Sequence, residues 1–319
     1  PGLTRFSDVH AANEVTRHGR AVLELLCREL AARGVTLLEA DTDGVYFAVP
    51  DAWTEADERR IVADVARLLP ARVQLEFDGR YAAMLSHEPK NYALRPYDAP
   101  LVLRGVAFRS SRNEPFGERF LRHALEHLLA GDVAAVQRVY IETVAALRKR
   151  AIPTYDMTAR VRLTKAPAQY LATRETRREL PYEAVLASGR TTWTVGERVR
   201  VYRATRGRSR VMPEFDDEID PAAAPDDDSP ATGDFAAAPI PREDPSDPRD
   251  YDVEHYLRVL RDTFAARFAR ALSPEDFAAV FADPEQPDLF ARSLEGARPV
   301  LTTIVQSPSV DDDHDYGHG

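Results

Sequence analysis

The sequence contains very little cysteine and no long apolar run. Its 319 residues include one cysteine, Cys27, so no intramolecular disulfide can form. No stretch of eighteen apolar residues is present, and the first ten residues lack the charged and apolar regions of a signal peptide. We therefore expect a soluble, cytoplasmic protein with no membrane segment. The length allows about two domains, each with its own core.

Lysine is also scarce, since only three of the 42 basic residues are lysine, and charge is unevenly distributed. Residues 213–250 contain 13 acidic residues, 2 basic residues and eight prolines, and four aspartates lie in the last nine residues. Residues 100–212 instead contain 22 Lys or Arg and 10 Asp or Glu, a net charge of +12. A solvated helix surface is the simplest explanation, but this excess favours a polyanionic partner.

Hydrophobic periodicity predicts an α+β fold for the first 110 residues, with two helices packed on one mainly antiparallel sheet. Ser7 and Gly34 bound the first predicted helix, and Thr54 with Asp57 forms a capping box for the second. The predicted strands cover residues 35–40, 45–49, 72–79, 80–85, 91–95 and 101–108.

The remaining chain is predicted to be mostly helical. Residues 115–150 form helices that break at Gly131 and Asp132, and a mixed region follows. Residues 213–250 have almost nothing apolar to bury and should form a disordered insertion. After it, a helix carries an apolar stripe that we expect to pack back on the basic region. The stripe consists of Tyr256, Leu260, Phe264 and Phe268.

Carboxylates, rather than histidines, form the candidate metal site. The eight histidines are scattered, and His123 and His127 lack a third ligand nearby in sequence. Asp41 and Asp43 lie at a predicted hairpin turn, where Asp is common for its turn chemistry. The alternative is a divalent-metal site, because two facing carboxylates repel each other without a cation between them. Glu76 and Asp78 would share one face of a predicted strand, which by itself indicates only a wet face.

The order of these elements resembles the palm of family B DNA polymerases. "EADTDGVYF" is similar to the third polymerase motif of that family, and "LEFDGRY" followed by "KNYA" is similar to its palm strand and K-x-Y element. "LRGVAFRSSRNEPF" resembles the basic-Gly element that leads into a long helix. Residues 158–203 resemble the thumb, and "DYDVEHYLRVL" resembles the helix that returns after it.

This resemblance implies template-directed addition of dNTPs to a primer 3′ end with two Mg²⁺ ions, for which Mn²⁺ can substitute. It implies that Asp43 ligates both metals, that Asp41 lies beside it and that Asp78 lies close by. Lys90 and Tyr92 would contact the primer–template DNA near the primer terminus. The other implied DNA-binding residues are Arg104, Gly105, Arg109, Arg112, Arg160, Arg162 and Lys165.

The chain also departs from the family pattern. Glu39 and Ala40 replace an aromatic-Gly pair, Gly44 replaces a Ser, and Arg112 stands where an acidic residue is frequent. These departures suggest a divergent, bacterial-type branch, and they leave the roles of Glu39 and Arg112 open. The family's first polymerase motif and its Lys-bearing finger helix are not found, so we expect a C-terminal fragment that is inactive alone.

On this basis five segments are predicted. They are a palm over residues 1–112, a basic thumb over 113–212, the acidic insertion over 213–250, C-terminal thumb helices over 251–290 and a mobile acidic tail over 291–319. The expected location is cytoplasmic and nucleoid-associated, with a role in DNA replication or repair.

"EQPDLF" resembles the short peptide by which bacterial polymerases dock on the sliding clamp. Leu289 and Phe290 would fill an apolar pocket of the clamp, while Gln286 and Asp288 would lie at its rim. Alternatively, Leu289 and Phe290 attach the chain end to the thumb.

Two other functions remain open from the sequence. A non-catalytic, polymerase-like DNA-binding subunit would have the same basic region. A D-x-D glycosyltransferase would use the same carboxylate pair, but it explains neither the basic thumb nor the K-x-Y element.

Overall fold

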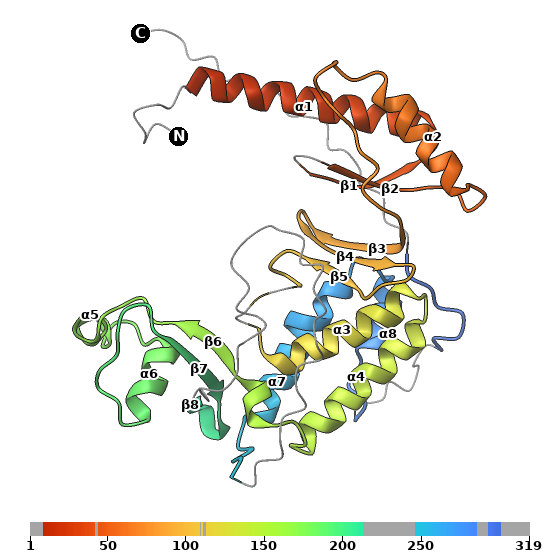
Figure 1. Ribbon diagram of the computed structural model, residues 1–319. Coiled ribbons are helices and arrows are strands. Elements are labelled where there is room, and N and C mark those ends of the chain that lie inside the picture. Colours follow the sequence, from red (N-terminus) through yellow and green to blue (C-terminus); the bar gives the residue numbers. More distant parts are fainter. Residues whose placement is uncertain are drawn as a thin grey trace, which may run out of the picture. The chain divides into compact units, whose positions relative to one another are not determined.

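A computed structural model describes residues 9–41, 44–108, 110, 113–212, 246–285 and 293–300, without the side chains of Val9 and Asp41. The chain divides between Gly79 and Arg80 into two compact units (Figure 1), which are described separately below. This division lies inside the segment predicted as palm. Among the described residues, no helix has both the length and the apolar character needed to cross a membrane.

In the residues that the structure describes, the first unit contains two helices and one hairpin. Helix α1 (Val9–Ala32) precedes strands β1 (Thr36–Asp41) and β2 (Gly44–Ala48), and helix α2 (Glu55–Ala66) follows. Gly34 has a φ of +87°, as expected for a glycine after a helix end. Thr54 and Asp57 form the predicted capping box of α2. The core side chains shared by these elements are Leu26, Leu30, Val35, Val65 and Leu69.

The strand predicted over residues 72–79 is absent, and so is the single predicted sheet. β1 and β2 form a two-stranded sheet, whereas the next strands form a separate three-stranded sheet. The predicted alternation is nevertheless present. Leu75 packs against the first unit's core, and the Arg59 guanidinium lies 4.6 Å from the centre of the Phe77 ring, while Glu76 and Asp78 are exposed. Apolar side chains can therefore alternate inward without a backbone ladder to a neighbouring strand.

The second unit begins with an antiparallel sheet. Strands β3 (Tyr81–Glu88), β4 (Asn91–Pro96) and β5 (Val102–Arg104) pair in that order. Only Pro89 and Lys90 connect β3 to β4, and Lys90 has a left-handed φ of +64°. Leu85 and Ala93 on this sheet are buried in the large core of the unit.

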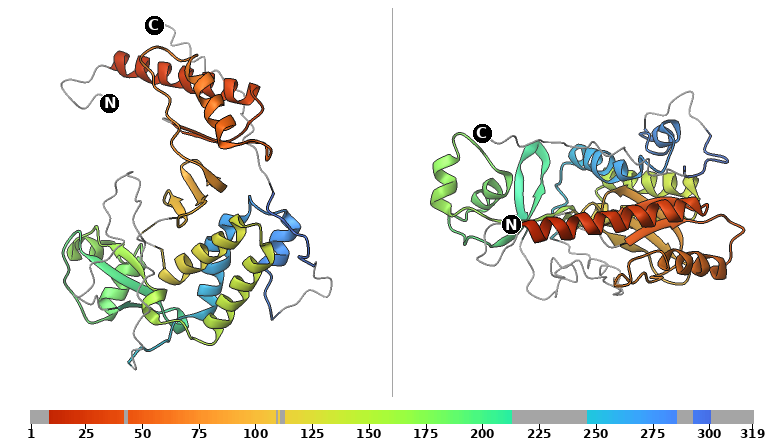
Figure 2. Two further views of the ribbon diagram at one scale, coloured as in Figure 1. Left: turned by 45° about the vertical axis from the view of Figure 1, so that its right-hand side comes forward. Right: turned by 90° about the horizontal axis from the view of Figure 1, so that it is seen from above.

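Helices α3 (Pro115–Leu129) and α4 (Val133–Arg148) pack side by side (Figures 1 and 2), with the predicted break between them. Asp132 caps α4 by accepting a hydrogen bond from the Ala135 N–H at 2.9 Å. The C-terminal segment consists of α7 (Val253–Val259), a π-helical turn (Leu260–Phe264), a 3-10 turn (Ala265–Phe268) and α8 (Pro274–Val280).

The predicted apolar stripe on this C-terminal segment is buried, which confirms its core role. Tyr256, Leu260, Phe264 and Phe268 share one core with residues of α3 and α4. Gly117 of α3 permits the closest approach, because a Cβ at that position would lie 2.0 Å from the Phe264 ring. The C-terminal segment therefore packs back on α3 and α4, within the basic region, as the sequence predicted.

A third sheet lies between the two helical parts of the chain in sequence. Strands β6 (Ala159–Arg162), β7 (Arg198–Arg203) and β8 (Ser209–Met212) are antiparallel, with β7 in the middle. Helices α5 (Pro167–Thr173) and α6 (Leu180–Ala187) accompany this sheet (Figure 1). Its core joins sheet residues to the two helices and contains Leu163, Tyr170, Tyr182, Val185, Trp193 and Val199.

Candidate nucleic-acid interface

The D-T-D motif begins at Asp41, the last residue of β1. Asp41 pairs with Gly44, the first residue of β2. Thr42, Asp43 and the Asp41 side chain lie outside the described residues. Glu39, two residues before Asp41 on the same strand, is 4% exposed and pairs with Tyr46. The structure thus places a buried carboxyl group on the strand that leads to the motif.

Carboxylate oxygens suit Mg²⁺, so the donor chemistry of the hairpin fits the implied metal. Among the residues whose side chains are described, no group of three or more His, Cys, Asp or Glu could hold an ion. Asp41 and Asp43 are outside that set. Asp78 is exposed on the extended segment after α2, in the same unit as the hairpin. Its proximity to the two aspartates stays a prediction.

Two predicted DNA-contact motifs meet in the β3–β4–β5 sheet. Tyr92 of the K-x-Y element pairs directly with Arg104 of the basic-Gly element, twelve residues away in sequence. Gly105 follows with a φ of +81°, and a Cβ there would lie 2.2 Å from the Lys90 carbonyl oxygen. The structure therefore brings Lys90, Tyr92, Arg104 and Gly105 together. Arg109 and Arg112 lie outside the described residues.

Asn91, which the sequence prediction did not include, joins these two motifs. Its side-chain Nδ2 donates to the Pro89 carbonyl at 2.9 Å, and its Oδ1 accepts from the Ala107 N–H at 2.8 Å. The side chain is 9% exposed, so both groups are satisfied within the protein. A polar residue at the x position of K-x-Y was the only available sequence signal.

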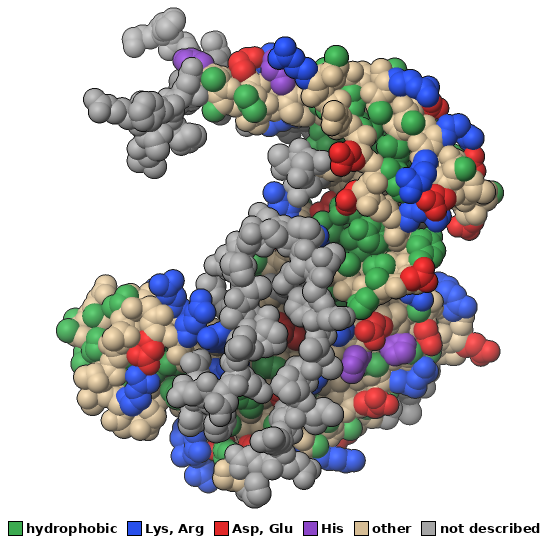
Figure 3. All heavy atoms as spheres, in the orientation of Figure 1, with side chains coloured by type: hydrophobic (Ala, Val, Ile, Leu, Met, Phe, Trp, Pro, Cys, Tyr) green, Lys and Arg blue, Asp and Glu red, His purple; other side chains and the backbone are tan. Residues whose placement is uncertain are grey.

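The β6–β7–β8 sheet has one face that is rich in arginine, which we call the arginine face. Arg160 pairs with Arg200 and Arg162 pairs with Arg198, and directly paired residues of antiparallel strands project from the same face. Arg210 belongs to this face as well, because Tyr202, two residues after Arg200, pairs with it. Lys and Arg side chains are visible over this part of the molecule in Figure 3.

The opposite face of the same sheet is apolar. Val199, Val201 and Val211 alternate with the arginines and pack in the core with α5 and α6. The two-residue period of the strands thus separates a buried valine face from the arginine face. The sequence prediction included Arg160 and Arg162, but it missed Arg198, Arg200 and Arg210, whose relation to them depends on strand register.

Two contacts restrain side chains of the arginine face. The Arg200 guanidinium lies 4.5 Å from the centre of the Tyr155 ring. Arg210 forms an ion pair with Asp250 at 3.0 Å, and the Tyr202 hydroxyl donates to the other oxygen of Asp250 at 2.9 Å. Burial, followed by this Asp250 contact, raises the pKa of Tyr202 to about 12.

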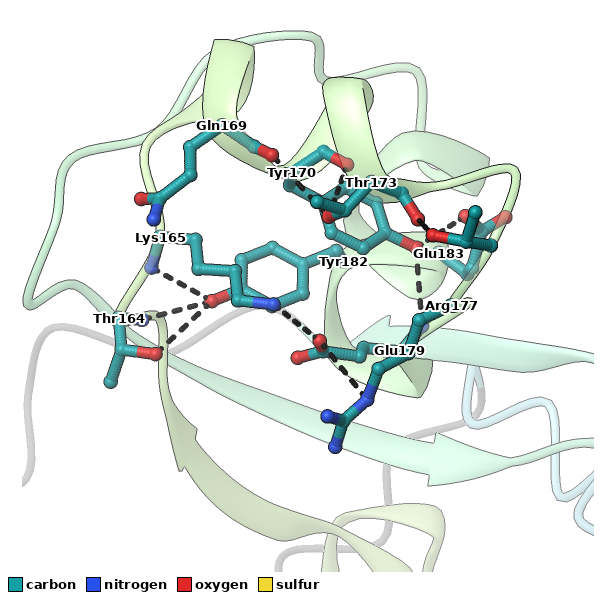
Figure 4. Close-up of polar contacts among 10 residues, drawn as sticks. Thr164, Lys165, Gln169, Tyr170, Thr173, Arg177, Glu179, Tyr182 and Glu183 are labelled. Atoms are coloured by element: carbon teal, nitrogen blue, oxygen red, sulfur yellow. Dashed lines mark hydrogen bonds and ion pairs between the residues drawn. The ribbon is translucent and has the colours of Figure 1, made fainter.

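Lys165, the third predicted thumb contact, lies in a polar network above the sheet (Figure 4). Its ammonium contacts Glu179 at 2.6 Å, and its backbone N–H donates to the Tyr182 hydroxyl at 2.9 Å. Arg177 also lies 3.7 Å from Glu179. The Lys165 ammonium is therefore already paired with a carboxylate of the protein.

A second ion pair holds α5 to α6. Arg174 binds both oxygens of Glu183, at 2.7 and 2.9 Å, and the Tyr170 hydroxyl donates to Glu183 at 2.6 Å. The Arg174 hydrogen bond is the main reason why the pKa of Glu183 is lowered to about 2. The rings of Tyr170 and Tyr182 stack with centroids 4.4 Å apart. This network fixes the helical tip on the apolar side of the sheet.

A buried carboxyl group lies at the start of α3, just after the basic-Gly element. Burial raises the pKa of Glu118 to about 7, and the Asn113 side chain donates to it at 3.4 Å. The buried Arg267 guanidinium opposes this shift. Glu118 therefore exchanges its proton near neutral pH inside the helical part of the second unit.

The known proteins that are similar to this chain are DNA polymerases, as the motifs in the sequence suggested. No family model matches the chain. A DNA polymerase of Pyrococcus horikoshii is 28% identical over 166 residues, which cover 50% of this chain and 13% of that protein. DNA polymerase 1 of Pyrococcus abyssi is 31% identical over 146 residues, which cover 44% of this chain and 19% of that protein. The chain thus matches less than a fifth of either relative.

The structure of the family B DNA polymerase from the hyperthermophilic archaeon Pyrobaculum calidifontis aligns with 85% of this chain and 31% of that chain, with a TM-score of 0.55 and 17% identity. The chain has the fold of part of a family B DNA polymerase. The chain is thus similar in sequence to short parts of DNA polymerases, and the predicted α+β class is confirmed. The named relatives are archaeal, so the bacterial-type branch is not confirmed.

Proposed function

We propose that this chain is the palm and thumb part of a DNA-directed DNA polymerase that extends a primer by two-metal-ion nucleotidyl transfer. Similarity to curated DNA polymerases supports the activity class. The observation that carries most weight is the arginine face, where Arg160 and Arg162 stand opposite Arg200 and Arg198. Such paired positive charges are unfavourable by themselves and are stabilised by a polyanion, so they favour binding to duplex phosphates.

In this proposal the hairpin holds the catalytic metals. Asp43 would ligate both Mg²⁺ ions, Asp41 would lie beside it, and Asp78 would contribute a further carboxylate. When bound, the two ions stabilise the attacking and leaving oxygens of the transfer from the dNTP to the primer. The protein's own part would be to hold Asp41 at the end of β1, where its backbone pairs with Gly44 of β2.

DNA binding is assigned to two surfaces of the second unit. Lys90, Tyr92, Arg104 and Gly105 would contact the primer–template backbone near the primer terminus, together with Arg109 and Arg112. The arginine face would grip duplex phosphates without reading sequence, because phosphate contacts carry no base information. Lys165 would contribute its charge only by exchanging Glu179 for a phosphate. The segment boundaries proposed above, with a palm before residue 113 and a thumb after it, follow from this assignment.

A clamp contact is the second partner that we propose. Gln286, Asp288, Leu289 and Phe290 lie outside the described residues, but the residues just before them are fixed. Arg148 of α4 binds Asp283 at 2.8 Å and Glu285 at 3.3 Å. A peptide anchored at its start and extended beyond Glu285 could reach a partner such as a bacterial sliding clamp.

The experiment that tests this function is Mg²⁺-dependent primer extension by the complete gene product and its variants. Asp43→Asn should abolish extension and leave the Kd for primer–template nearly unchanged, and Asp41→Asn should do so less completely. Asp51→Asn, an exposed aspartate two residues beyond Val49, removes the same charge near the hairpin and is the control. Extension by Asp43→Asn at the wild-type rate would disprove the metal assignment. DNA binding without any extension by the wild type would instead favour the non-catalytic subunit.

A further inference from the structure

We infer that Asn91 is a positioning residue for DNA binding. Its side chain connects the Pro89–Lys90 turn to the loop that contains Gly105, and it thereby determines where Lys90 contacts a phosphate. The inference rests on the proposed DNA-binding function. It concerns a side chain that contacts neither metal nor nucleotide in that proposal.

The geometry of the turn requires a restraint. Lys90 has a φ of +64°, a left-handed conformation that is unfavourable for a non-glycine residue and persists only where neighbouring groups enforce it. The Asn91 Nδ2 hydrogen bond to the Pro89 carbonyl, at 2.9 Å, bridges the residues on either side of Lys90. This contact closes the turn from within.

The other end of the Asn91 side chain fixes the turn to a distant segment. Its Oδ1 accepts from the Ala107 N–H at 2.8 Å, sixteen residues away. Gly105 lies against the same groups, since a Cβ there would be 2.2 Å from the Lys90 carbonyl oxygen and 2.4 Å from Asn91 Oδ1. No side chain fits between the turn and the loop. The Lys90 carbonyl and the Asn91 side chain thus both lie against Gly105.

Because Asn91 is buried, the loss of its two side-chain hydrogen bonds cannot easily be compensated by water. Asn91 is 9% exposed, so removing its amide would leave the Ala107 N–H and the Pro89 carbonyl without their partner in a largely dry site. The turn would then lose the restraint on its left-handed residue, and the Lys90 ammonium would sample positions away from the phosphate. The expected consequence is the loss of one phosphate contact, rather than a general loss of fold.

The test measures the salt dependence of duplex binding by the 319-residue chain. Each lost phosphate contact should make the slope of log K against log salt less steep by about 0.9. We expect Lys90→Ala and Asn91→Ala each to make the slope less steep by about this amount, and the double variant to change it by no more than either substitution alone. Gly105→Ala should have the same effect, because its methyl group displaces the same turn.

Gly131→Ala is the matched control. Gly131 has the same φ of +81° as Gly105, but a Cβ there meets nothing within 4 Å. Both substitutions therefore introduce the same backbone strain, and only Gly105→Ala should change the slope. Where Asn91→Ala does not fold, Asn91→Ser and Gly105→Ala give the same comparison.

The positioning role of Asn91 and the proposed DNA contact of Lys90 would fail in different ways in this experiment. An unchanged slope in Asn91→Ala and Gly105→Ala, with the expected loss in Lys90→Ala, would overturn the positioning role alone. Additive slope losses in the double variant would overturn it as well, because Asn91 would then act independently of Lys90. No slope change in Lys90→Ala, or no duplex binding by the chain, would instead count against the proposed DNA contact itself.

Discussion

Arg160 on β6 lies directly opposite Arg200 on β7, and both project from the same face of the sheet. Like charges in directly opposed positions of an antiparallel pair destabilise that pair. The ring of Tyr155, 4.5 Å from the Arg200 guanidinium, offsets part of this cost, since a cation over an aromatic face is attracted to it. If the face binds DNA as proposed, phosphates would offset more of this cost.

We expect Arg160→Gln and Arg200→Gln to weaken duplex binding similarly for unrelated DNA sequences. If Lys90 and the four arginines of β6 and β7 each neutralise one phosphate, while Arg210 stays paired with Asp250, the slope of log K against log salt should be about −4 to −5 in the wild type. Each substitution should make it less steep by about 0.9, as measured by fluorescence anisotropy at several salt concentrations. Arg138→Gln, on an exposed part of α4, is the control. A slope near zero in the wild type, or a strong sequence preference, would contradict the arginine face as a DNA grip.

This face also illustrates what sequence reasoning could reach. Only a mixed region ending in a strand was predicted here, within a mostly helical part, whereas the structure has the strands β6 and β7, in which arginine and valine alternate in "RVRL" and "RVRVYR". The pairing of Arg160 with Arg200 joins residues forty positions apart and depends on register. Register is set by the fit of Val199, Val201 and Val211 against the helices, so it requires the tertiary structure.

In the extended segment around Asp78, the sequence predicted a strand that the structure does not contain. Its alternating pattern predicts a strand, and its burial does alternate, but the segment pairs with no described strand. Burial of Leu75 and Phe77 against the first unit already satisfies the pattern. The capping box at Thr54 and Asp57, in contrast, was predictable because all of its groups lie within four residues.

The Glu183 network gives a prediction about acid stability. The folded pKa of Glu183 is about 2, below the usual value of about 4.3 for an unfolded chain. Its ion pair with Arg174 therefore stabilises the fold fully above the unfolded pKa, and this contribution is lost as the pH falls through 4 toward 2. Glu183→Gln should lower the Tm of the α5–α6 tip at pH 7, and its difference from the wild type should shrink as the pH is lowered.

The measurement is thermal unfolding followed by Trp193 fluorescence in a Trp53→Phe background, because Trp193 packs beside Tyr170 and Tyr182. Glu175→Gln, an exposed neighbour on the same tip, removes the same charge and should leave the Tm almost unchanged. A Tm difference for Glu183→Gln that is constant with pH would show that the carboxylate charge does not contribute.

The clamp proposal is tested with a peptide that spans residues 283–292. We expect it to bind a bacterial sliding clamp with micromolar Kd, equivalent to about −8 kcal/mol, as measured by isothermal titration calorimetry. Replacing Leu289 and Phe290 by Ala should remove this binding. In the complete gene product the same double substitution should reduce processivity and leave single-nucleotide incorporation unchanged. A lower Tm with clamp-stimulated synthesis intact would instead indicate that the two side chains attach the chain end to the thumb.

Asp250 gives the last prediction, because it neutralises one member of the arginine face. Its carboxylate binds Arg210 at 3.0 Å and accepts from the Tyr202 hydroxyl at 2.9 Å. Asp250→Asn keeps an oxygen that can accept from Tyr202, so the strand should stay in place while the negative charge is removed. Arg210 would then meet a phosphate without first leaving a carboxylate. We therefore expect tighter duplex binding, and a slope of log K against log salt that is steeper by up to about 0.9.

The control for Asp250→Asn is Asp262→Asn, which removes an equal charge from an exposed position on the π-helical turn. Both variants change the net charge by +1, so general electrostatic attraction to DNA should rise equally in both. Only Asp250→Asn should steepen the slope beyond that common effect, and Arg210→Gln in the same background should remove the gain. Equal slopes in the two variants would show that Arg210 does not contact phosphate, and the arginine face would then be limited to β6 and β7.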